Sequence, residues 1–301
     1  MVIIVDGNHL ASRCYFAIDP LTTSKGHLTN VTYGCINTIR SYKKRFGNAY
    51  LIIVWDGRGK KEEHKIYEQY KADRKAFPEE YYIQIKDTQN ILNALNVIQF
   101  QYDNIEADDV IGTITYKARK KGQKVVIISS DHDFEQLISS HVQIIIPSLA
   151  IYKEKTKDYN YVLERYVGLK PSQLVEMMSL TGDDSDNLDG IDGIGNKIAA
   201  RLIKANGSLE NVISNVDNLK TYNKKNELID APDNLKTKIK NNIETIKICN
   251  KVVALNCHLD VDVKFEHTRQ IHIDRLKELF INFEFKSFLN EIDQWQSIFS
   301  R

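Results

Sequence analysis

The sequence predicts an α/β protein in which a parallel sheet covered by helices is followed by a smaller, mostly helical module. Short apolar, β-branched runs alternate with helical stretches up to about residue 155, and no such run follows. A glycine-rich stretch at 182–195 then precedes further helical segments. Continuous apolar runs are typical of strands buried on both faces, and their alternation with helices predicts an open parallel sheet.

The elements of the first half follow in order along the chain. Strands are expected at 2–5, 51–55, 125–129 and 143–146, and helices at 31–45, 79–95 and 107–120. In the second half, residues 215–235 are rich in Asn, Lys and Asp, which predicts a solvated loop.

The composition indicates a globular protein of about two domains. The 301 residues are 42% hydrophobic, with 41 basic and 40 acidic side chains, which excludes disorder and coiled coil. No apolar run approaches the roughly 20 residues that span a bilayer, and no basic, signal-like N-terminus is present, so we expect a cytoplasmic protein. Four cysteines lie far apart, which predicts reduced thiols and neither a zinc site nor a disulfide framework.

Acidic residues directly follow three of the predicted strands. Asp6 follows VIIV, Asp56 follows LIIVW, and Asp131 and Asp133 follow VVIISS. Parallel strands present their carboxyl ends at one edge, where ligands bind. Two further motifs, IEADDVIG and TGDDSDN, contribute Glu106, Asp108, Asp109, Asp183 and Asp186. The pattern therefore predicts a crowded carboxylate edge.

Each acid taken alone is more often a helix cap or a turn former. The repetition at three strand ends favours a site, because crowded carboxylates repel one another unless a cation lies between them. Carboxylates without a set of His or Cys ligands indicate Mg²⁺ or Mn²⁺. Two such ions would serve phosphodiester hydrolysis by activating water and stabilising the leaving oxygen.

The segment GIDGIGNKIAARLI has the pattern of a helix-hairpin-helix motif. Gly190, Gly193 and Gly195 precede an apolar helix that carries Lys197 and Arg201 one turn apart. Exposed amides at the start of such a helix can hold a phosphate, which predicts DNA binding independent of base sequence. The alternative is an ordinary glycine-rich loop before a core helix.

The basic strip KKEEHKIYEQYKADRKAF, at 60–77, carries Tyr67 and Tyr70. Such a strip is more often a solvated helix face. Its place directly after the Asp56 strand instead suggests a segment over the acid cluster, where basic groups neutralise a phosphate and a tyrosine stacks on a base.

Seven motifs occur here together and in one order: VDGNH, VWDG, QYKADRK, IEADDVIG, SSDHDFEQL, TGDDSDN and GIDGIGNKIAARLI. In these motifs the chain resembles the 5′ nucleases, also called flap endonucleases or 5′-3′ exonucleases, which include bacteriophage enzymes and the N-terminal domain of bacterial DNA polymerase I. The segment LKELFINFEFKSFLNEI, at 276–292, is similar to the end of that nuclease domain. The resemblance covers nearly the whole chain and implies a stand-alone nuclease of the phage type.

The resemblance implies three regions. These are a PIN-like catalytic domain at 1–165 with a helical arch at about 58–80, a helix-hairpin-helix (helix-three-turn-helix) module at 166–256, and a C-terminal segment at 257–301 that packs back on the nuclease core. The implied activity is metal-dependent hydrolysis of 5′ ends and 5′ flaps of DNA, and of RNA primers, in replication.

The resemblance also implies roles for individual residues. Asp6, Asp56, Glu106 and Asp108 would approach a first Mg²⁺, and Asp131, Asp133, Asp183 and Asp186 a second, with the choice between Asp108 and Asp109 left open. Mn²⁺ would substitute for Mg²⁺. Lys71 and Arg74 would lie near the scissile phosphate and Tyr70 would stack on a base, while the hairpin would hold the downstream duplex and bind K⁺.

Two residues depart from the family pattern. His132 stands where many relatives carry Lys or Gly, and Asp189 stands where they usually carry Pro. We expect His132 to alter the field around the second metal and Asp189 to loosen the start of the hairpin. Every matched acid is present, so we predict an active enzyme.

Two rival interpretations remain, a PIN-like RNase and a non-catalytic protein that binds forks or junctions. The expected partners are forked, nicked or flapped DNA, an RNA–DNA hybrid, and a replication polymerase or single-strand binding protein. We expect no membrane association and a monomer.

Overall fold

The computed structural model describes residues 1–59, 63–73, 75–149, 153–265 and 270–300. Its main sheet has six strands in the order β3-β2-β1-β4-β5-β6, with β1 to β5 parallel and β6 antiparallel to β5. The strands are β1 (Val2–Asp6), β2 (Tyr50–Asp56), β3 (Ile98–Tyr102), β4 (Val125–Ile128), β5 (Val142–Ile146) and β6 (Lys155–Lys157). The α/β class with a parallel sheet is therefore confirmed.

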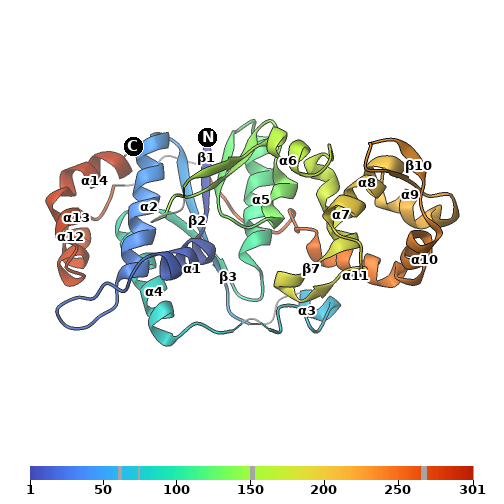
Figure 1. Ribbon diagram of the computed structural model, residues 1–301. Helices are drawn as coiled ribbons and strands as arrows, with labels where there is room; N and C mark the ends of the chain where they lie inside the picture. Colours follow the sequence, from blue (N-terminus) through green and yellow to red (C-terminus); the bar gives the residue numbers. More distant parts are fainter. Residues whose placement is uncertain (60–62, 74, 150–152, 266–269, 301) are drawn as a thin grey trace.

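Helices cover both faces of this sheet (Figure 1). The helices of the first half are α1 (Gly7–Ala17), α2 (Asn30–Phe46), α3 (Glu63–Ile66), α4 (Glu79–Ala94), α5 (Ala107–Lys120) and α6 (Tyr159–Arg165). The second half contains α7 (Leu174–Thr181), α8 (Asn196–Asn206), α9 (Leu209–Ser214), α10 (Asp233–Asn241), α11 (Ile243–Val253), α12 (Ile273–Asn282), α13 (Lys286–Asn290) and α14 (Ile292–Phe299). It also contains two small hairpins, β7 (Gly182–Asp183) with β8 (Leu188–Asp189), and β9 (Lys220–Tyr222) with β10 (Leu228–Asp230).

The central strand β1 separates two hydrophobic cores. Val2 and Ile4 point into a core formed with α5 and the helical module, whereas Ile3 and Val5 point into a core formed with α1, α2 and α4. Side chains of a strand alternate between its two faces, so a continuous apolar run buries both. The carboxyl ends of the strands are thereby held between two packed layers.

The C-terminal helices belong to the second of these cores. Trp295 of α14 is fully buried, with its ring centroid 5.2 Å from that of Phe280 and 4.9 Å from that of Phe288. Helix α12 contacts α4 and helix α14 contacts α2. The C-terminal helices and the helical module lie on opposite sides of the sheet (Figure 1).

Several parts of the secondary structure differ from the prediction. β3 was not predicted, because Ile98, Phe100 and Tyr102 alternate with glutamines on an edge strand and form no continuous run. Strands also occur from residue 155 onward, namely β6 and the two small hairpins β7–β8 and β9–β10. Within the part of 58–80 that the structure describes, α-helix is confined to α3 and the first residues of α4.

The segment 215–235 is largely exposed, as predicted, but it is not a loop. This segment contains the β9–β10 hairpin and the start of α10. The side chain of Asn223 closes the hairpin, since its Oδ1 accepts the backbone N–H of Lys225 (2.9 Å) and Glu227 (3.0 Å). Asn side chains commonly stabilise turns in this way. The side chains of Leu219 and Ala231, before and after the hairpin, are buried.

None of the helices in the described ranges is both long enough and apolar enough to cross a membrane.

Candidate active site

Acids from three strand ends and two later motifs meet at the carboxyl edge of the sheet. Asp6 and Asp56 are the last residues of the paired strands β1 and β2. Asp131 and Asp133 follow β4 where the chain turns into a short 3₁₀ helix, η1 (Asp133–Leu137). Glu106 is the residue directly before α5.

The first acid group, comprising Asp6, Asp56, Glu106 and Asp108, is partly held by hydrogen bonds within the fold. Asp6 accepts the backbone N–H of His9 (3.0 Å) and the hydroxyl of Ser129 (3.0 Å). Asp56 Oδ1 accepts the backbone N–H of Ala107 (3.1 Å) at the start of α5. Asp6 and Asp56 therefore also cap helix starts, which is the structural role expected of a single acid after a strand. The caps also fix where the remaining oxygens point.

The two adjacent aspartates of α5, between which the sequence leaves the choice open, have different neighbours. Asp108 lies in the field of Asp131 and Asp6, and burial together with these neighbours raises its pKa well above the ordinary value. Asp109 Oδ1 instead accepts the backbone N–H of Asn256 (2.8 Å), on the segment that leaves α11. Asp109 thus ties α5 to the helical module, while burial and also Glu106 raise its pKa, so both aspartates lie in the field of the acids.

The second acid group consists of Asp131, Asp133, Asp183 and Asp186. One carboxylate oxygen each from Asp133, Asp183 and Asp186 lies within 4.8 Å of the other two. Asp131 Oδ1 accepts the backbone N–H of Asp133 (2.9 Å), which links the two acids of this turn. Asp183 Oδ1 accepts the amide (2.8 Å) and the hydroxyl (2.6 Å) of Ser185.

The acid cluster has the properties of a site for divalent cations. Burial, with nearby Asp56 and Asp131, raises the pKa of Asp6 from 3.8 to about 6, although His9 opposes the shift. Burial and the neighbouring carboxylates Asp131, Asp183 and Asp186 raise the pKa of Asp133 well above its ordinary value. Among the described residues, no group donates a hydrogen bond to the buried Oδ1 of Asp133. A buried acceptor without a donor, surrounded by carboxylates, fits a hard metal ion.

Lys71 and Tyr70 lie directly against both acid groups. Lys71 Nζ donates to Glu106 Oε1 (2.8 Å) and Oε2 (2.7 Å) and lies 3.5 Å from Asp186 Oδ2. The hydroxyl of Tyr70 donates to Glu106 Oε2 (3.1 Å) and Asp186 Oδ2 (3.0 Å). The Tyr70 side chain is buried, which does not fit the prediction that its ring stacks on a base. Arg74 lies outside the described residues.

The glycine-rich segment 190–195, the expected helix-hairpin-helix turn, lies next to the second acid group. A Cβ atom on Gly190 would lie 2.1 Å from the carbonyl carbon of Thr181, and Gly193 has a φ of +75°, so both positions require glycine. Gly195 precedes α8, where Lys197 is exposed and Arg201 half-exposed. A cavity of 460 Å³, lined by Asp133, Asp183 and Gly195 among others, connects the acids to the first residues of α8.

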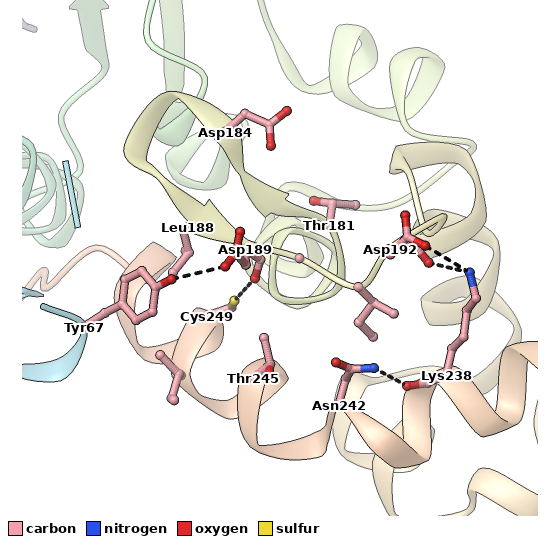
Figure 2. A pocket seen from close by; sticks show the side chains of 13 residues that line it. Tyr67, Thr181, Asp184, Leu188, Asp189, Asp192, Lys238, Asn242, Thr245 and Cys249 are labelled. Carbon is pink, nitrogen blue, oxygen red and sulfur yellow. Dashed lines mark hydrogen bonds and ion pairs between the residues drawn. The ribbon is translucent and has the colours of Figure 1, made fainter. Parts of the chain in front are cut away.

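Asp189 is more firmly held than its sequence position suggested. Figure 2 shows that Tyr67 OH donates to Asp189 Oδ2 (3.3 Å) and that the Cys249 thiol donates to the carbonyl of Asp189 (3.1 Å). Tyr67, Asp189 and Cys249 are among the residues that line a cavity of 760 Å³ between the β7–β8 hairpin and α11. The Cys249 contact uses the main-chain carbonyl, which any residue offers, so the expectation that Asp189 loosens the start of the hairpin stays a prediction.

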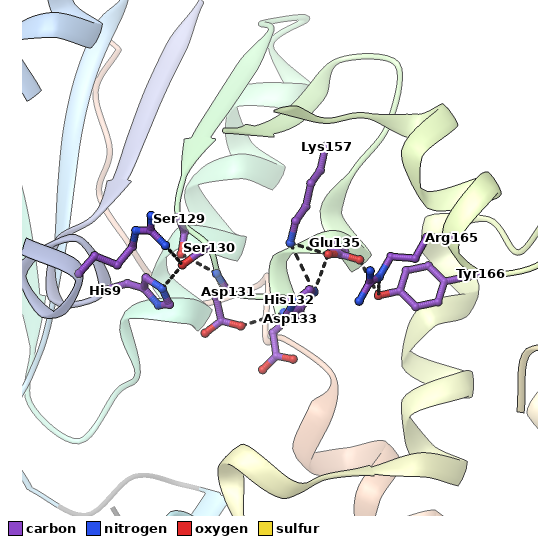
Figure 3. Close-up of polar contacts among 11 residues, drawn as sticks. His9, Ser129, Ser130, Asp131, His132, Asp133, Glu135, Lys157, Arg165 and Tyr166 are labelled. Atoms are coloured by element: carbon purple, nitrogen blue, oxygen red, sulfur yellow. Dashed lines mark hydrogen bonds and ion pairs between the residues drawn. The ribbon is translucent and has the colours of Figure 1, made fainter. Parts of the chain in front are cut away.

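One buried network beside the acids was missed by the sequence analysis. Glu135 accepts hydrogen bonds from Lys157 Nζ (2.6 Å), Tyr166 OH (2.7 Å) and His132 Nδ1 (2.7 Å), as Figure 3 shows. Burial alone would raise the pKa of Glu135, but the hydrogen bonds from His132 and Lys157 lower it to about 2. The available signal was a Glu in FEQLI, directly after Phe134 and two residues before Leu137.

Comparison with known proteins identifies relatives over nearly the whole chain. Residues 1–167 match the 5′-3′ exonuclease N-terminal resolvase-like domain, and residues 169–276 match the 5′-3′ exonuclease C-terminal SAM fold. The chain is 32% identical over 296 residues to the 5′-3′ exonuclease of Aquifex aeolicus, covering 97% of this chain and 94% of that protein. It is 33% identical over 290 residues to the thermostable DNA polymerase I of Thermus thermophilus, covering 96% of this chain. The chain spans 33% of the length of that polymerase.

Solved structures share the fold at lower identity. The T5 5′-exonuclease with bound divalent metal ions (zinc) aligns with a TM-score of 0.68 and 18% identity, covering 98% of this chain and 99% of that one. The catalytic core of Rad2 in complex with DNA substrate aligns with a TM-score of 0.60 and 17% identity, covering 97% and 90% of the two chains.

Proposed function

The chain belongs to the 5′-3′ exonuclease family, and on this premise we propose that it is a divalent-metal-dependent, structure-specific nuclease. It would hydrolyse phosphodiester bonds at 5′ ends and 5′ flaps of DNA, and at RNA primers, during replication. The observation that carries the proposal is the buried carboxylate edge, in which Asp133 offers an oxygen without a donor beside Asp183 and Asp186.

Two Mg²⁺ ions, replaceable by Mn²⁺, are the proposed cofactors. Asp6, Asp56, Glu106 and Asp108 would hold one ion, and Asp131, Asp133, Asp183 and Asp186 the other. Asp109 is left out of this ligand set, because its Oδ1 accepts the Asn256 amide. Such ions lower the pKa of water and stabilise charge on a leaving oxygen.

The chain's own groups would position the substrate around this edge. Lys71 places an ammonium beside Glu106 and Asp186, where it would oppose the negative charge of a phosphodiester approaching the acids. Arg74 is proposed for the same role on sequence grounds alone. The backbone amides after Gly195, with Lys197 and Arg201, would hold a phosphate of the duplex, and K⁺ is the proposed ion of this hairpin.

The proposed partner is therefore a flapped, nicked or forked duplex. A contact with a replication polymerase or a single-strand binding protein, and a monomeric state, remain part of the proposal.

Exchange of Asp183 for Asn tests the ligand assignment. Asp183→Asn should lower turnover at saturating Mg²⁺ by more than about 100-fold, because even residues that only support a ligand contribute about 10–100-fold. Binding of the duplex should change little. Asp184→Asn is the matched control, since Asp184 is the exposed neighbour in the same turn and lies outside the three-acid cluster. Wild-type turnover of the Asp183 variant would show that the site is assigned wrongly.

A further inference from the structure

The carboxylate of Glu135 lies in the interior, directly behind the turn that carries Asp131 and Asp133. Glu135 is 0% exposed and Lys157 is 2% exposed, so their ion pair is removed from water. Tyr166 OH donates to the second carboxylate oxygen, and His132 contacts the first. Figure 3 shows Lys157, His132 and Tyr166 gathered around Glu135, with the Asp133 carboxylate pointing away from them.

The partners of Glu135 come from three separate elements. Lys157 is the last residue of the edge strand β6, Tyr166 is the residue after α6, and His132 precedes η1. The network therefore ties the acid-bearing turn both to the edge of the sheet and to the beginning of the helical module.

Stability alone does not account for a charged group at this position. Phe134 is fully buried and Leu137 and Ile138 are nearly so, and apolar side chains can replace a buried ion pair without loss of stability. A fully satisfied polar network, however, fixes one geometry. The ion pair is therefore better explained by orientation than by folding energy.

Among the described residues, no group donates a hydrogen bond to the buried Asp133 Oδ1, so the direction of this carboxylate depends on the position of the turn that carries it. Asp131 is in turn linked to this turn, because its Oδ1 accepts the Asp133 amide and its own amide donates to Ser129 Oγ (3.1 Å). A rotation of η1 would thus displace Asp133 and disturb its hydrogen bond with Asp131, which Ser129 holds from the strand side.

We propose that Glu135, held by Lys157, Tyr166 and His132, is a positioning residue that sets Asp131 and Asp133 in place as ligands for a divalent cation. This inference rests on the proposed function, because it concerns the same cation site.

The test compares Glu135→Gln with Glu154→Gln. Glu154 is a matched control, because it also accepts from a tyrosine, Tyr42 OH (2.7 Å), and from a cation, Arg45 Nη1 (2.8 Å), but it is not part of the acid cluster. Mn²⁺ binding is measured by the electron paramagnetic resonance signal of free Mn²⁺. Glu135→Gln should raise the Kd for Mn²⁺ by about 10–100-fold, as expected for a residue that orients ligands, and Glu154→Gln should leave it unchanged.

Hydrogen–deuterium exchange of the metal-free protein gives a readout that needs no cleavage. The amides of residues 131–137 should exchange at least about 10-fold faster in Glu135→Gln than in the wild type or the control, since the turn is released from its anchor. The double variant Glu135→Leu/Lys157→Met removes both charges and should stay folded. It should still bind Mn²⁺ as weakly as Glu135→Gln.

Several outcomes would overturn the inference. A folded Glu135→Gln or double variant that binds Mn²⁺ within twofold of the wild type would refute the positioning role, while cleavage by the wild type would leave the proposed function intact. If the wild type itself bound no Mn²⁺ and cut no flap, the inference and the proposed function would fail together.

Discussion

Tyr70 and Lys71 are held at the acid site by hydrogen bonds from their side chains and from the Lys71 backbone. The hydroxyl of Tyr70 bridges Glu106 and Asp186, and the amide of Lys71 donates to the carbonyl of Asp186 (2.9 Å). Lys71 also has a φ of +56°, a conformation that non-glycine residues adopt only when their surroundings fix it. In this arrangement Lys71 offsets the negative charge of the acids, and both residues orient them. The Tyr70 ring is buried.

Replacement of Tyr70 by Phe distinguishes this role from base stacking. Tyr70→Phe keeps the ring but removes the donor to two carboxylates, so it should lower the free energy of unfolding by about 1.5–3 kcal/mol. Tyr82→Phe, on a half-exposed ring, should change it by less than about 0.5 kcal/mol. Urea unfolding in EDTA measures both values. Unchanged stability in Tyr70→Phe, with loss of flap cleavage in Tyr70→Ala alone, would instead favour stacking.

The sequence showed which residue types form the site but not where every side chain points. Asp6, Asp56, Asp131 and Asp133 were placed at one edge because strand ends meet there. The direction of Asp109 depends on the Asn256 amide, 147 residues away, and no local pattern contains such a contact. The ion pair of Glu135 with Lys157, the last residue of the edge strand β6, likewise appears in no local sequence pattern.

At the scale of elements, prediction succeeded for strands buried on both faces and failed at the edges. β1, β2 and β4 contain continuous apolar runs and β5 ends in three isoleucines, whereas the edge strand β3 alternates with glutamines and β6 is a three-residue strand of Lys and Thr. Edge strands are stabilised by their neighbours more than by their own composition. The β9–β10 hairpin was missed for a related reason, because its polar residues also form the turn.

The close approach at the start of the hairpin gives a prediction at this scale. Gly190→Ala would place a Cβ atom against the backbone of Thr181, and the resulting shift should cost about 1–3 kcal/mol of stability and weaken duplex binding. A Cβ atom on Gly195 meets no atom within 4 Å among the described residues, so Gly195→Ala should change stability by less than about 1 kcal/mol. Thermal unfolding and duplex binding by fluorescence anisotropy check both variants. Equal effects of the two changes would contradict the packing argument.

At the scale of the whole molecule, the second acid group exists only because the helical module folds against the sheet. Asp133 follows strand β4, whereas Asp183 and Asp186 lie in and after the β7 strand that follows α7. The core between them runs continuously from the sheet through α5 to α7 and α8. Sequence order could place each acid on its element, but the approach of the two modules depends on this shared core.

Cation binding should therefore stabilise the assembled molecule. Mg²⁺ at 100 times its Kd should raise the free energy of unfolding by about 2.7 kcal/mol, seen as a saturable increase in Tm relative to EDTA. Asp133→Asn should reduce this response, because it replaces a carboxylate of the second group. A Tm that is independent of Mg²⁺ in the wild type would argue against a cation site that spans the two modules.

The most direct test of the central claim is cleavage of a DNA duplex that carries a labelled 5′ single-stranded flap, assayed with Mg²⁺ and with EDTA, with the product ends mapped. The account predicts cutting near the junction of single strand and duplex in Mg²⁺ and none in EDTA. A parallel RNA flap separates this activity from that of an RNase. Binding of the flap substrate without cutting in either Mg²⁺ or Mn²⁺ would contradict the account and favour a protein that only binds junctions.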